Sequence, residues 1–355
     1  MRTTQSQISV TLNYSFVSNK RNIIFWMITM LIFSTISSKA KGEDKSDSLL
    51  LREAQNVNKN FPYANMVDFQ YTYYTPSSIK TKVKGQDFLD TKMNFQQWLT
   101  TSVNLPLLIT PSFMIINSFK YQYATLNLEN SGSEAYHDIR NYLTEAEAGN
   151  SYTEALNFIY IGKAFEKKIT CILNISADFS DHGYERINGS LAVTLEIKHT
   201  DRTSISLGMM GTTDPLASTP IVPLISVFHW FSDKYYLDCV APSYLYIRRI
   251  YANKSRLSIG TNLSSYQSFT HPSIPSLTSF TYQRGKVELA AIYEKNLCAG
   301  LNLFSKVGYV MNLRDKVSLT NSDNTTMFIS QKPNFSINIG ATYNFIPQKY
   351  RTTNQ

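Results

Sequence analysis

The stretch Phe335-Ser336-Ile337-Asn338-Ile339-Gly340-Ala341-Thr342-Tyr343-Asn344-Phe345 alternates with a period of two near the end of the 355-residue chain. Its odd-numbered residues are apolar or aromatic, and its even-numbered residues are polar or glycine. Successive side chains of a β-strand point to opposite faces, so the stretch predicts a strand with one apolar and one polar face. Its length also matches the about 9 to 11 residues with which a tilted strand crosses a bilayer.

The same alternation recurs along the chain and is clearest from Val67 to Tyr73, from Ile169 to Phe179 and from Leu191 to Ile197. Tyr and Phe are abundant (23 and 20), only 17% of the residues are charged, and the mean hydropathy of -0.21 is too polar for a helical membrane protein. A transmembrane β-barrel combines these features, because half of each strand faces lipid and half faces water. A soluble β-sandwich rich in aromatic residues fits the composition nearly as well.

The lengths of the connections provide a second signal. Single-chain bacterial barrels alternate short periplasmic turns with longer extracellular loops, and their even strand number leaves both termini in the periplasm. Here the first connection (76–92) is long, the second is short, the third (127–153) is long and the fourth (163–166) is short, and the alternation goes on through 180–188, 200–202, 211–221 and 232–234. The alternation continues only if Pro242 marks a turn, because proline cannot donate to a central ladder. Loops then follow at 265–279 and 314–332, which gives an antiparallel up-and-down barrel of about fourteen strands, with twelve as the next choice.

The N-terminus has the layout of a secretory signal peptide. An apolar run from Ile23 to Ile36 follows Lys20 and Arg21 and precedes Ser38-Lys39-Ala40, which predicts cleavage after Ala40. The run is shorter than the about 20 residues of a membrane-spanning helix, although an uncleaved signal anchor is the alternative. The residues before Lys20 are an unusual extension that suggests a start codon placed too early. The predicted parts are a signal peptide (1–40), a flexible periplasmic lead-in (41–65), a β-barrel (66–346) and a C-terminal tail (347–355).

The charge of the mature chain does not indicate nucleic-acid binding. Removal of residues 1–40 takes away four basic residues and no acidic one, so the formal net charge falls from +8 to +4. No Lys/Arg cluster on a helix supports a nucleic-acid interface. The three cysteines lie in strand-like runs without metal-binding spacing, and we interpret them as small apolar residues: Cys171, Cys239 and Cys298.

No catalytic constellation stands out. The five histidines are scattered, and no Gly-rich phosphate loop, zinc-ligand spacing or EF-hand run is present. We therefore expect no cofactor and no enzymatic activity. The enzymatic alternative is an outer-membrane lipid hydrolase with a Ser/His/acid arrangement, for which the proximity of Ser226 and His229 is weak support because serine is common in this chain.

Charged residues in the inward register are the candidate functional residues. They fall opposite apolar lipid-facing positions and are expected to line the lumen: Lys120, Asp178, Glu196, Lys198, Arg248, Glu288 and Lys306. Charged lumen walls tune which solutes pass, whereas mutual pairing would plug a closed interior. Aromatic residues near strand ends suit interfacial girdles, namely Tyr73, Tyr74, Trp98, Tyr123, Trp230, Tyr235, Tyr343 and Phe345.

Three segments of the chain resemble a family of uncharacterised outer-membrane β-barrel proteins of Bacteroidetes-type bacteria. They are Phe228-His229-Trp230-Phe231, the run Cys239-Val240-Ala241-Pro242 with the following Arg248, and the closing Gly340 to Phe345. The resemblance covers about residues 60–346 and implies a barrel without an established activity. The ten residues after Phe345 depart from the usual barrel ending, in which the terminal aromatic residue is read by the assembly machinery.

These observations predict a porin-like protein in the outer membrane of a Gram-negative bacterium, acting as a pore or as a binding or structural barrel. The expected partners are outer-membrane lipid and, during biogenesis, the barrel assembly machinery, with no nucleic acid; the oligomeric state is left open. A lipid-modifying barrel enzyme and a secreted soluble β-sandwich that binds ligands are the alternatives.

Overall fold

The computed structural model describes residues 61, 65–83, 86–129, 149–214, 219–271, 280–298, 300–319 and 325–344. The predicted signal peptide, most of the predicted lead-in, Phe345 and the predicted C-terminal tail lie outside these residues. In the part of the chain that is described, no helix combines the length and apolar character needed to cross a membrane.

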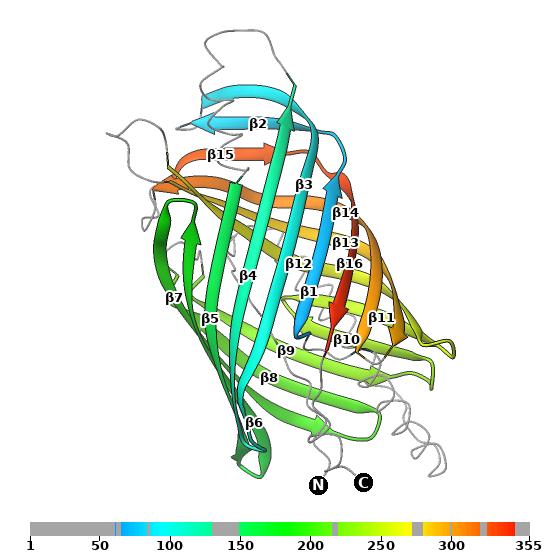
Figure 1. Ribbon diagram of the computed structural model, residues 1–355. Coiled ribbons are helices and arrows are strands. Elements are labelled where there is room, and N and C mark those ends of the chain that lie inside the picture. Colours follow the sequence, from blue (N-terminus) through cyan, green and yellow to red (C-terminus); the bar gives the residue numbers. More distant parts are fainter. Residues whose placement is uncertain are drawn as a thin grey trace.

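The described chain forms sixteen strand segments (Figure 1). They are β1 (Val67–Tyr74), β2 (Ser77–Val83), β3 (Gln86–Ile109), β4 (Phe113–Leu128), β5 (Gly149–Ala164), β6 (Lys167–Ser180), β7 (Gly183–His199), β8 (Thr203–Thr212), β9 (Ile221–Trp230), β10 (Tyr235–Ala241), β11 (Tyr244–Tyr251), β12 (Ser255–Thr270), β13 (Phe280–Cys298), β14 (Leu301–Leu319), β15 (Thr325–Gln331) and β16 (Asn334–Tyr343).

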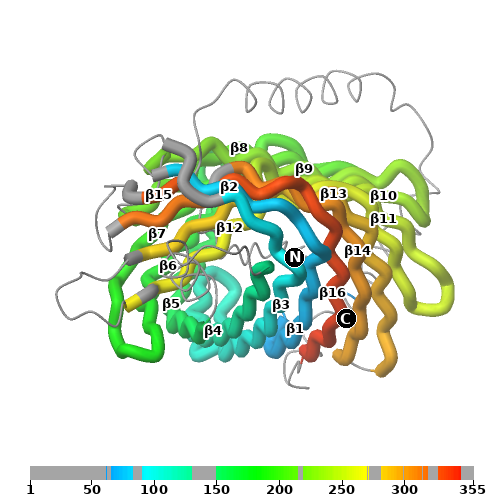
Figure 2. Tube along the Cα trace, turned by 90° about the horizontal axis from the view of Figure 1, so that it is seen from above, coloured from blue at the N-terminus to red at the C-terminus, as the bar shows by residue number. Residues whose placement is uncertain are grey.

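These segments build a closed antiparallel barrel of fourteen strands. Segments β1 and β2 both pair with β3 and are two parts of the first strand; β15 and β16 both pair with β14 and are two parts of the last strand. The seam closes where β1 pairs with β16 and β2 pairs with β15, and the view from above shows these segments side by side (Figure 2). The predicted strand number and the turn at Pro242, between β10 and β11, are confirmed.

In the lower part of the wall, where β1 begins and β16 ends (Figure 1), exposed side chains are apolar and buried inner side chains are polar. On β16 the odd-numbered Phe335, Ile337 and Ile339 are about half exposed, whereas Ser336 and Asn338 are buried inside. This arrangement is that of a strand wall whose outer face contacts lipid. A soluble sandwich would bury the apolar face instead, so that alternative is wrong.

The first and last strands bend at one level of the wall. Thr75-Pro76 separates β1 from β2, and Lys332-Pro333 separates β15 from β16. The neighbouring strands carry one extra residue at the same level, Asn94 on β3 and Leu313 on β14. We call this line of interruptions the crease. Above it β2 and β15 lie across the upper end of the barrel, at a steep angle to β1 and β16 (Figure 1).

The crease has a local chemical cause. Proline lacks the N–H that a ladder needs, and an extra residue in one strand shifts the alternation of side chains by one position. The hydroxyl of Thr75 accepts a hydrogen bond from the backbone N–H of Phe335 at 3.0 Å, which replaces a ladder contact at the interruption. The break therefore costs few hydrogen bonds.

Above the crease the polarity of the wall is inverted. We call this part the cap: β2, β15 and the upper ends of β3, β13 and β14. Its inner face carries apolar side chains such as Ile79 and Ile329, which are 1% and 5% exposed. Its outer face carries exposed polar side chains at Lys80, Lys82, Asp90, Lys92, Ser330 and Lys332. A one-residue shift exchanges the two faces of a strand, so the crease accounts for the inversion.

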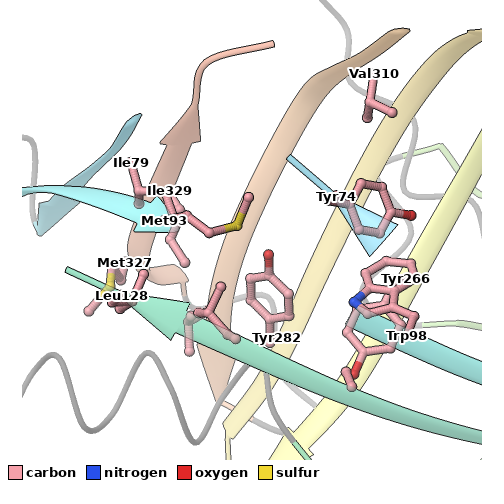
Figure 3. Packing of buried hydrophobic residues seen from close by; sticks show 13 residues of the cluster. Tyr74, Ile79, Met93, Trp98, Leu128, Tyr266, Tyr282, Val310, Met327 and Ile329 are labelled. Atoms are coloured by element: carbon pink, nitrogen blue, oxygen red, sulfur yellow. The ribbon is translucent and has the colours of Figure 1, made fainter. Parts of the chain in front are cut away.

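Buried apolar residues form one cluster that spans the upper lumen (Figure 3). The cap contributes Ile79, Met93, Tyr282, Val317, Met327 and Ile329, and the wall near the crease contributes Tyr74, Trp98, Ala124, Leu126, Leu128, Tyr266 and Val310. The cluster places apolar side chains from both sides across the upper lumen. The upper part of the lumen is therefore a packed core.

Several predicted loops are strand. Residues 76–92 contain β2 and the start of β3, and residues 314–332 contain the end of β14 and all of β15. Residues 180–188 contain a tight turn at Asp181-His182 followed by the start of β7. The loop predictions were wrong here because polar residues on the cap's outer face and at hairpin tips resemble loop sequence. Residues 130–148 lie outside the described part.

Candidate functional site

A layer of aromatic side chains separates the packed upper lumen from the space below it. Tyr74 and Trp98 reach in from β1 and β3, and Tyr266 and Tyr282 reach in from β12 and β13 on the opposite wall (Figure 3). The ring centroids of Trp98 lie 5.2 Å from Tyr74 and 4.6 Å from Tyr266, and those of Tyr266 and Tyr282 lie 6.1 Å apart. These contacts continue from one wall to the other, so the four aromatic rings close the top of the space below them. We call this layer the roof.

A polar cavity of about 420 Å³ lies below this layer. It extends along β1 from Tyr74 down to Asn65 just before the strand, and along β3 from Trp98 down to Asn104. Side chains of β4, β5 and β6 continue this wall on one side, β16 and β14 continue it on the other, and β13 and β12 complete the lining. Most lining side chains are amides, hydroxyls or charged groups, which can donate or accept hydrogen bonds.

Three lysines and two carboxylates line this cavity. Lys306 donates to Glu288 at 2.6 Å, and Glu288 also accepts a hydrogen bond from Ser336. Lys286 donates to the hydroxyl of Tyr74, and its ammonium lies 4.2 Å from the centroid of the Trp98 ring. Asp68 accepts a hydrogen bond from Gln70 at 2.7 Å. Lys120 projects into the cavity from β4.

The cavity is narrowed from the side by β12. Strand β11 ends its pairing with β12 at Asn262, so the upper half of β12 leaves that neighbour. Cα atoms of β12 and β5, which do not pair, come within 8 Å of each other across the lumen. A second small pocket, lined by Lys120, Gln122, Thr153, Asp178 and Gln267 among others, lies beside this approach.

The lower lumen next to β10–β13 is filled by an arginine network. Arg256 forms two hydrogen bonds of 2.6 Å to Glu294, and Arg248 donates to Asp238 at 2.9 Å. The ring of Phe61 packs over the Arg256 guanidinium at 4.6 Å. Both arginines are buried and paired, which compensates the cost of removing their charges from water. The paired charges of this network link strands β10, β11, β12 and β13 inside the lumen.

A second ionic network lies inside the wall near the upper ends of β6 and β7. Arg186 contacts Asp178 at 3.1 Å and Asp214 at 3.0 Å and donates to Gln267 on β12. Asn188 also donates to Asp178, at 3.0 Å. The network connects β7 to β12, which are separated in the sheet by the shorter strands β8–β11.

The structure places the seven sequence-predicted lumen residues as follows. Lys120, Glu288 and Lys306 line the cavity, Asp178 lies in the Arg186 network, and Arg248 lies in the arginine network. Glu196 faces inward and accepts hydrogen bonds from Ser204 and His199 near the lower rim.

Lys198 is placed differently. A register shift between Glu196 and Lys198 sets Lys198 opposite Ile205 on the outer face, where it is exposed. The lumen-facing assignment of Lys198 is therefore corrected: one extra residue in the strand reverses its side.

Three inward charges were not predicted from the sequence: Lys286, Arg256 and Arg186. Lys286 and Arg256 share the parity of inward residues two positions away, Glu288 and Ser258, so their alternation carried the signal. Arg186 shares the parity of the inward-facing Asn188 on β7, but it lay in the predicted loop 180–188.

Part of the predicted aromatic girdle also faces inward. Tyr74, Trp98 and Trp230 are buried inside the barrel at 3%, 7% and 1% exposure. Tyr123, Tyr235 and Tyr343 are exposed on the outer face at about 40%. Tyr73 shares that outer face and is partly buried. Because Tyr74 has the opposite parity to Tyr73, the adjacent aromatic pair covers both faces of β1.

The residues expected for a hydrolase are not assembled near Ser226. Ser226 faces the lumen and His229 faces outward, because residues three apart on a strand point to opposite sides. No group of three or more His, Cys, Asp or Glu side chains within the described ranges has the geometry to hold a metal ion.

Similarity to known proteins is found at the level of solved structures. No protein-family model matches the sequence, and no curated protein matches it. The fold is similar to an outer-membrane channel from Pseudomonas putida F1 (TM-score 0.38, 12% identity, 79% of this chain and 96% of the other). It is also similar to the TodX monoaromatic hydrocarbon channel of P. putida (0.35, 8%, 83% and 94%). A third similar structure is the calcium-bound outer-membrane phospholipase dimer of Salmonella typhi (0.33, 10%, 85% and 99%).

These similarities concern the fold, and their low TM-scores leave the function to be argued from this chain's own residues. A closed fourteen-stranded wall with an apolar outer belt and a polar interior defines the class: the protein is a transmembrane β-barrel of the outer-membrane type.

Proposed function

We propose that the protein is a solute-binding barrel in the outer membrane of a Gram-negative bacterium, with its lower end in the periplasm. The observation that carries this proposal is a polar cavity of about 420 Å³ beneath a packed roof. Small-molecule sites in proteins have volumes of about 300–1,000 Å³. The cavity therefore has the size to hold one small polar solute.

The packed upper lumen favours binding over a standing pore. Solute passage requires a continuous polar path, whereas the apolar cluster and the aromatic layer fill the barrel above the cavity. Expulsion of water from such a core stabilises the closed state. The porin-like fold thus carries a binding site that is closed towards the cap.

Conductance and cysteine accessibility test this proposal together. In planar bilayers the wild-type barrel is expected to give no steady current. In a background of Cys171→Ser, Cys239→Ala and Cys298→Ser, Thr100→Cys in the cavity wall should react with a small methanethiosulfonate reagent. Thr81→Cys in the cap, where Thr81 is 1% exposed, should stay unmodified.

Heat-modifiable migration on a gel confirms that each variant is folded. Steady ohmic current through the wild type, or a Thr100→Cys thiol that does not react in the folded barrel, would refute a closed solute-binding lumen.

The proposed role requires no chemical step, so the protein acts without catalysis and without a cofactor. A lipid hydrolase would release fatty acid from phospholipid vesicles, and such release by the wild type would replace the binding role. Lipid around the apolar belt and the barrel assembly machinery during insertion are the proposed partners. The resemblance to the Bacteroidetes-type barrel family stays a prediction.

A further inference from the structure

Two lysines enter the cavity from opposite walls without a salt bridge to a carboxylate of the described residues. Lys120 extends from β4 and Lys286 extends from β13, and both line the cavity. A buried ammonium group is stable only when hydrogen bonds or an opposite charge replace its water shell. The surroundings of these two lysines therefore indicate what the cavity is built to hold.

The carboxylates near the cavity are already engaged. Glu288 accepts from Lys306 and Ser336, and Asp178 forms its salt bridge with Arg186. Asp178 and, to a smaller extent, Asp68 act on Lys120 at longer range, and Asp68 also accepts a hydrogen bond from Gln70. Within the described residues, Lys120 has no hydrogen bond and no salt bridge.

Lys286 is held in place by aromatic groups, and Glu288 acts on it electrostatically without forming a salt bridge among the described residues. Its ammonium donates to the Tyr74 hydroxyl and lies 4.7 Å from the Tyr74 ring centroid and 4.2 Å from that of Trp98. Contacts with ring faces position a cation but leave its positive charge in the site. A second cation thus sits at the roof of the cavity.

Uncharged polar atoms around the cavity also lack partners among the described residues. The indole N–H of Trp98 donates to no acceptor, and the side-chain oxygens of Asn262, Ser264 and Asn338 accept no hydrogen bond. Buried polar groups are normally hydrogen-bonded, and these four residues all line the cavity, so each retains unused hydrogen-bonding capacity beside it. They add one donor and three acceptors to the lining that also contains the two lysines.

We propose that the cavity binds a small hydroxylated organic anion, with its carboxylate held by Lys120 and Lys286 and its hydroxyls held by the neighbouring amide and hydroxyl groups. This inference rests on the proposed solute-binding function and specifies the solute as a carboxylate of sugar-acid size. Charge-assisted hydrogen bonds are about twice as strong as neutral ones, so the carboxylate provides most of the selectivity.

Calorimetric titration of the folded barrel in detergent micelles tests the proposal with two matched probes, galacturonate and galactose. The wild type should bind galacturonate at least about tenfold more tightly, because each charged hydrogen bond is worth about one to two factors of ten. Lys120→Met and Lys286→Met should each weaken galacturonate binding by about tenfold or more. Lys92→Met, on the exposed outer face of the cap, serves as the matched control and should leave the affinity unchanged.

The sugar pair on the wild type tests the inference even if a lysine variant fails to fold. Equal affinity for the two sugars, or no binding of galacturonate, overturns the anion inference. If both sugars bind equally and Ser102→Trp, which fills the cavity, abolishes both, the solute-binding function stands and the anion preference falls. If the two sugars bind equally or galacturonate does not bind, and the thiol of Thr100→Cys stays unreactive as well, both proposals fall.

Discussion

The cap and the lower barrel are made from the same strands with opposite polarity. Below the crease, Phe335, Ile337 and Ile339 face outward from the last strand; above it, Met327 and Ile329 on that strand face inward. The lower wall thus suits lipid outside and water inside, whereas the cap suits water outside and a dry core inside. A shift by one residue at the crease is enough to exchange the two faces of a strand, so its apolar side faces outward below the crease and inward above it.

The largest expected effect concerns the ion pair in the cap. Arg284 and Asp315 lie 3.3 Å apart, with side chains 3% and 0% exposed. Asp315→Asn should destabilise the barrel by about 3–5 kcal/mol, because removal of one partner leaves a buried charge uncompensated. Urea unfolding followed by tryptophan fluorescence measures the loss. The double variant Arg284→Met/Asp315→Leu should recover most of it, and an equal loss in both variants would contradict the argument.

A matched pair of isoleucines compares the two interiors directly. Ile79 lies in the cap core and Ile159 lies at the cavity wall, and both are nearly buried. Ile79→Ala should cost about 2–5 kcal/mol, since it opens a void in a packed core. Ile159→Ala should cost less, because its side chain already borders open space. Equal losses in urea unfolding would mean that the two interiors are packed alike.

Charges placed on the outer face locate the edge of the membrane. Ile339 is 54% exposed below the crease, and Phe328 is 40% exposed on the cap. Ile339→Lys should cost about 2–4 kcal/mol if it lies near the bilayer midplane. Phe328→Lys should be tolerated, as the cap's outer face is already rich in lysine. Refolding yields in lipid vesicles report both, and a tolerated Ile339→Lys would place that part of the wall in water.

The smallest effect is expected at the cap surface. Lys80 and Asp90 form a 2.8 Å salt bridge with side chains 57% and 64% exposed. Exposed pairs contribute about 0–1 kcal/mol, so Lys80→Ala should hardly change the urea midpoint. A loss comparable with that of Ile79→Ala would show that the cap depends on its surface charges.

Strict alternation predicted the wall and its strand number but not the cap. Strands such as β6 and β16 keep one phase along the described length, so their sequence shows their faces directly. The strands at the crease change phase by one residue, and their upper parts carry Lys80, Lys82 and Lys332 on the solvent side. Such segments resemble polar loops, because their own sequence does not show that a neighbouring strand bends at the same level and pairs with them.

The candidate site was only partly predictable for a related reason. Parity along a strand assigns Lys120 and Glu288 to the lumen, but it cannot tell a paired charge from one without a partner. By alternation, Lys306 on β14 and Lys286 on β13 both point into the lumen. Lys306 pairs with the carboxylate of Glu288, whereas Lys286 contacts aromatic rings. That difference depends on the register between strands, which only the assembled barrel provides.

The seam between the first and last strands has a consequence for the order of folding. Val83 at the end of β2 pairs with Met327 of β15, so part of the cap joins residues more than two hundred positions apart. Contacts of such sequence separation form late, because a long loop must close before they are gained. The cap core can therefore be completed only after the chain has delivered its last strand, which makes the cap a late marker of finished assembly.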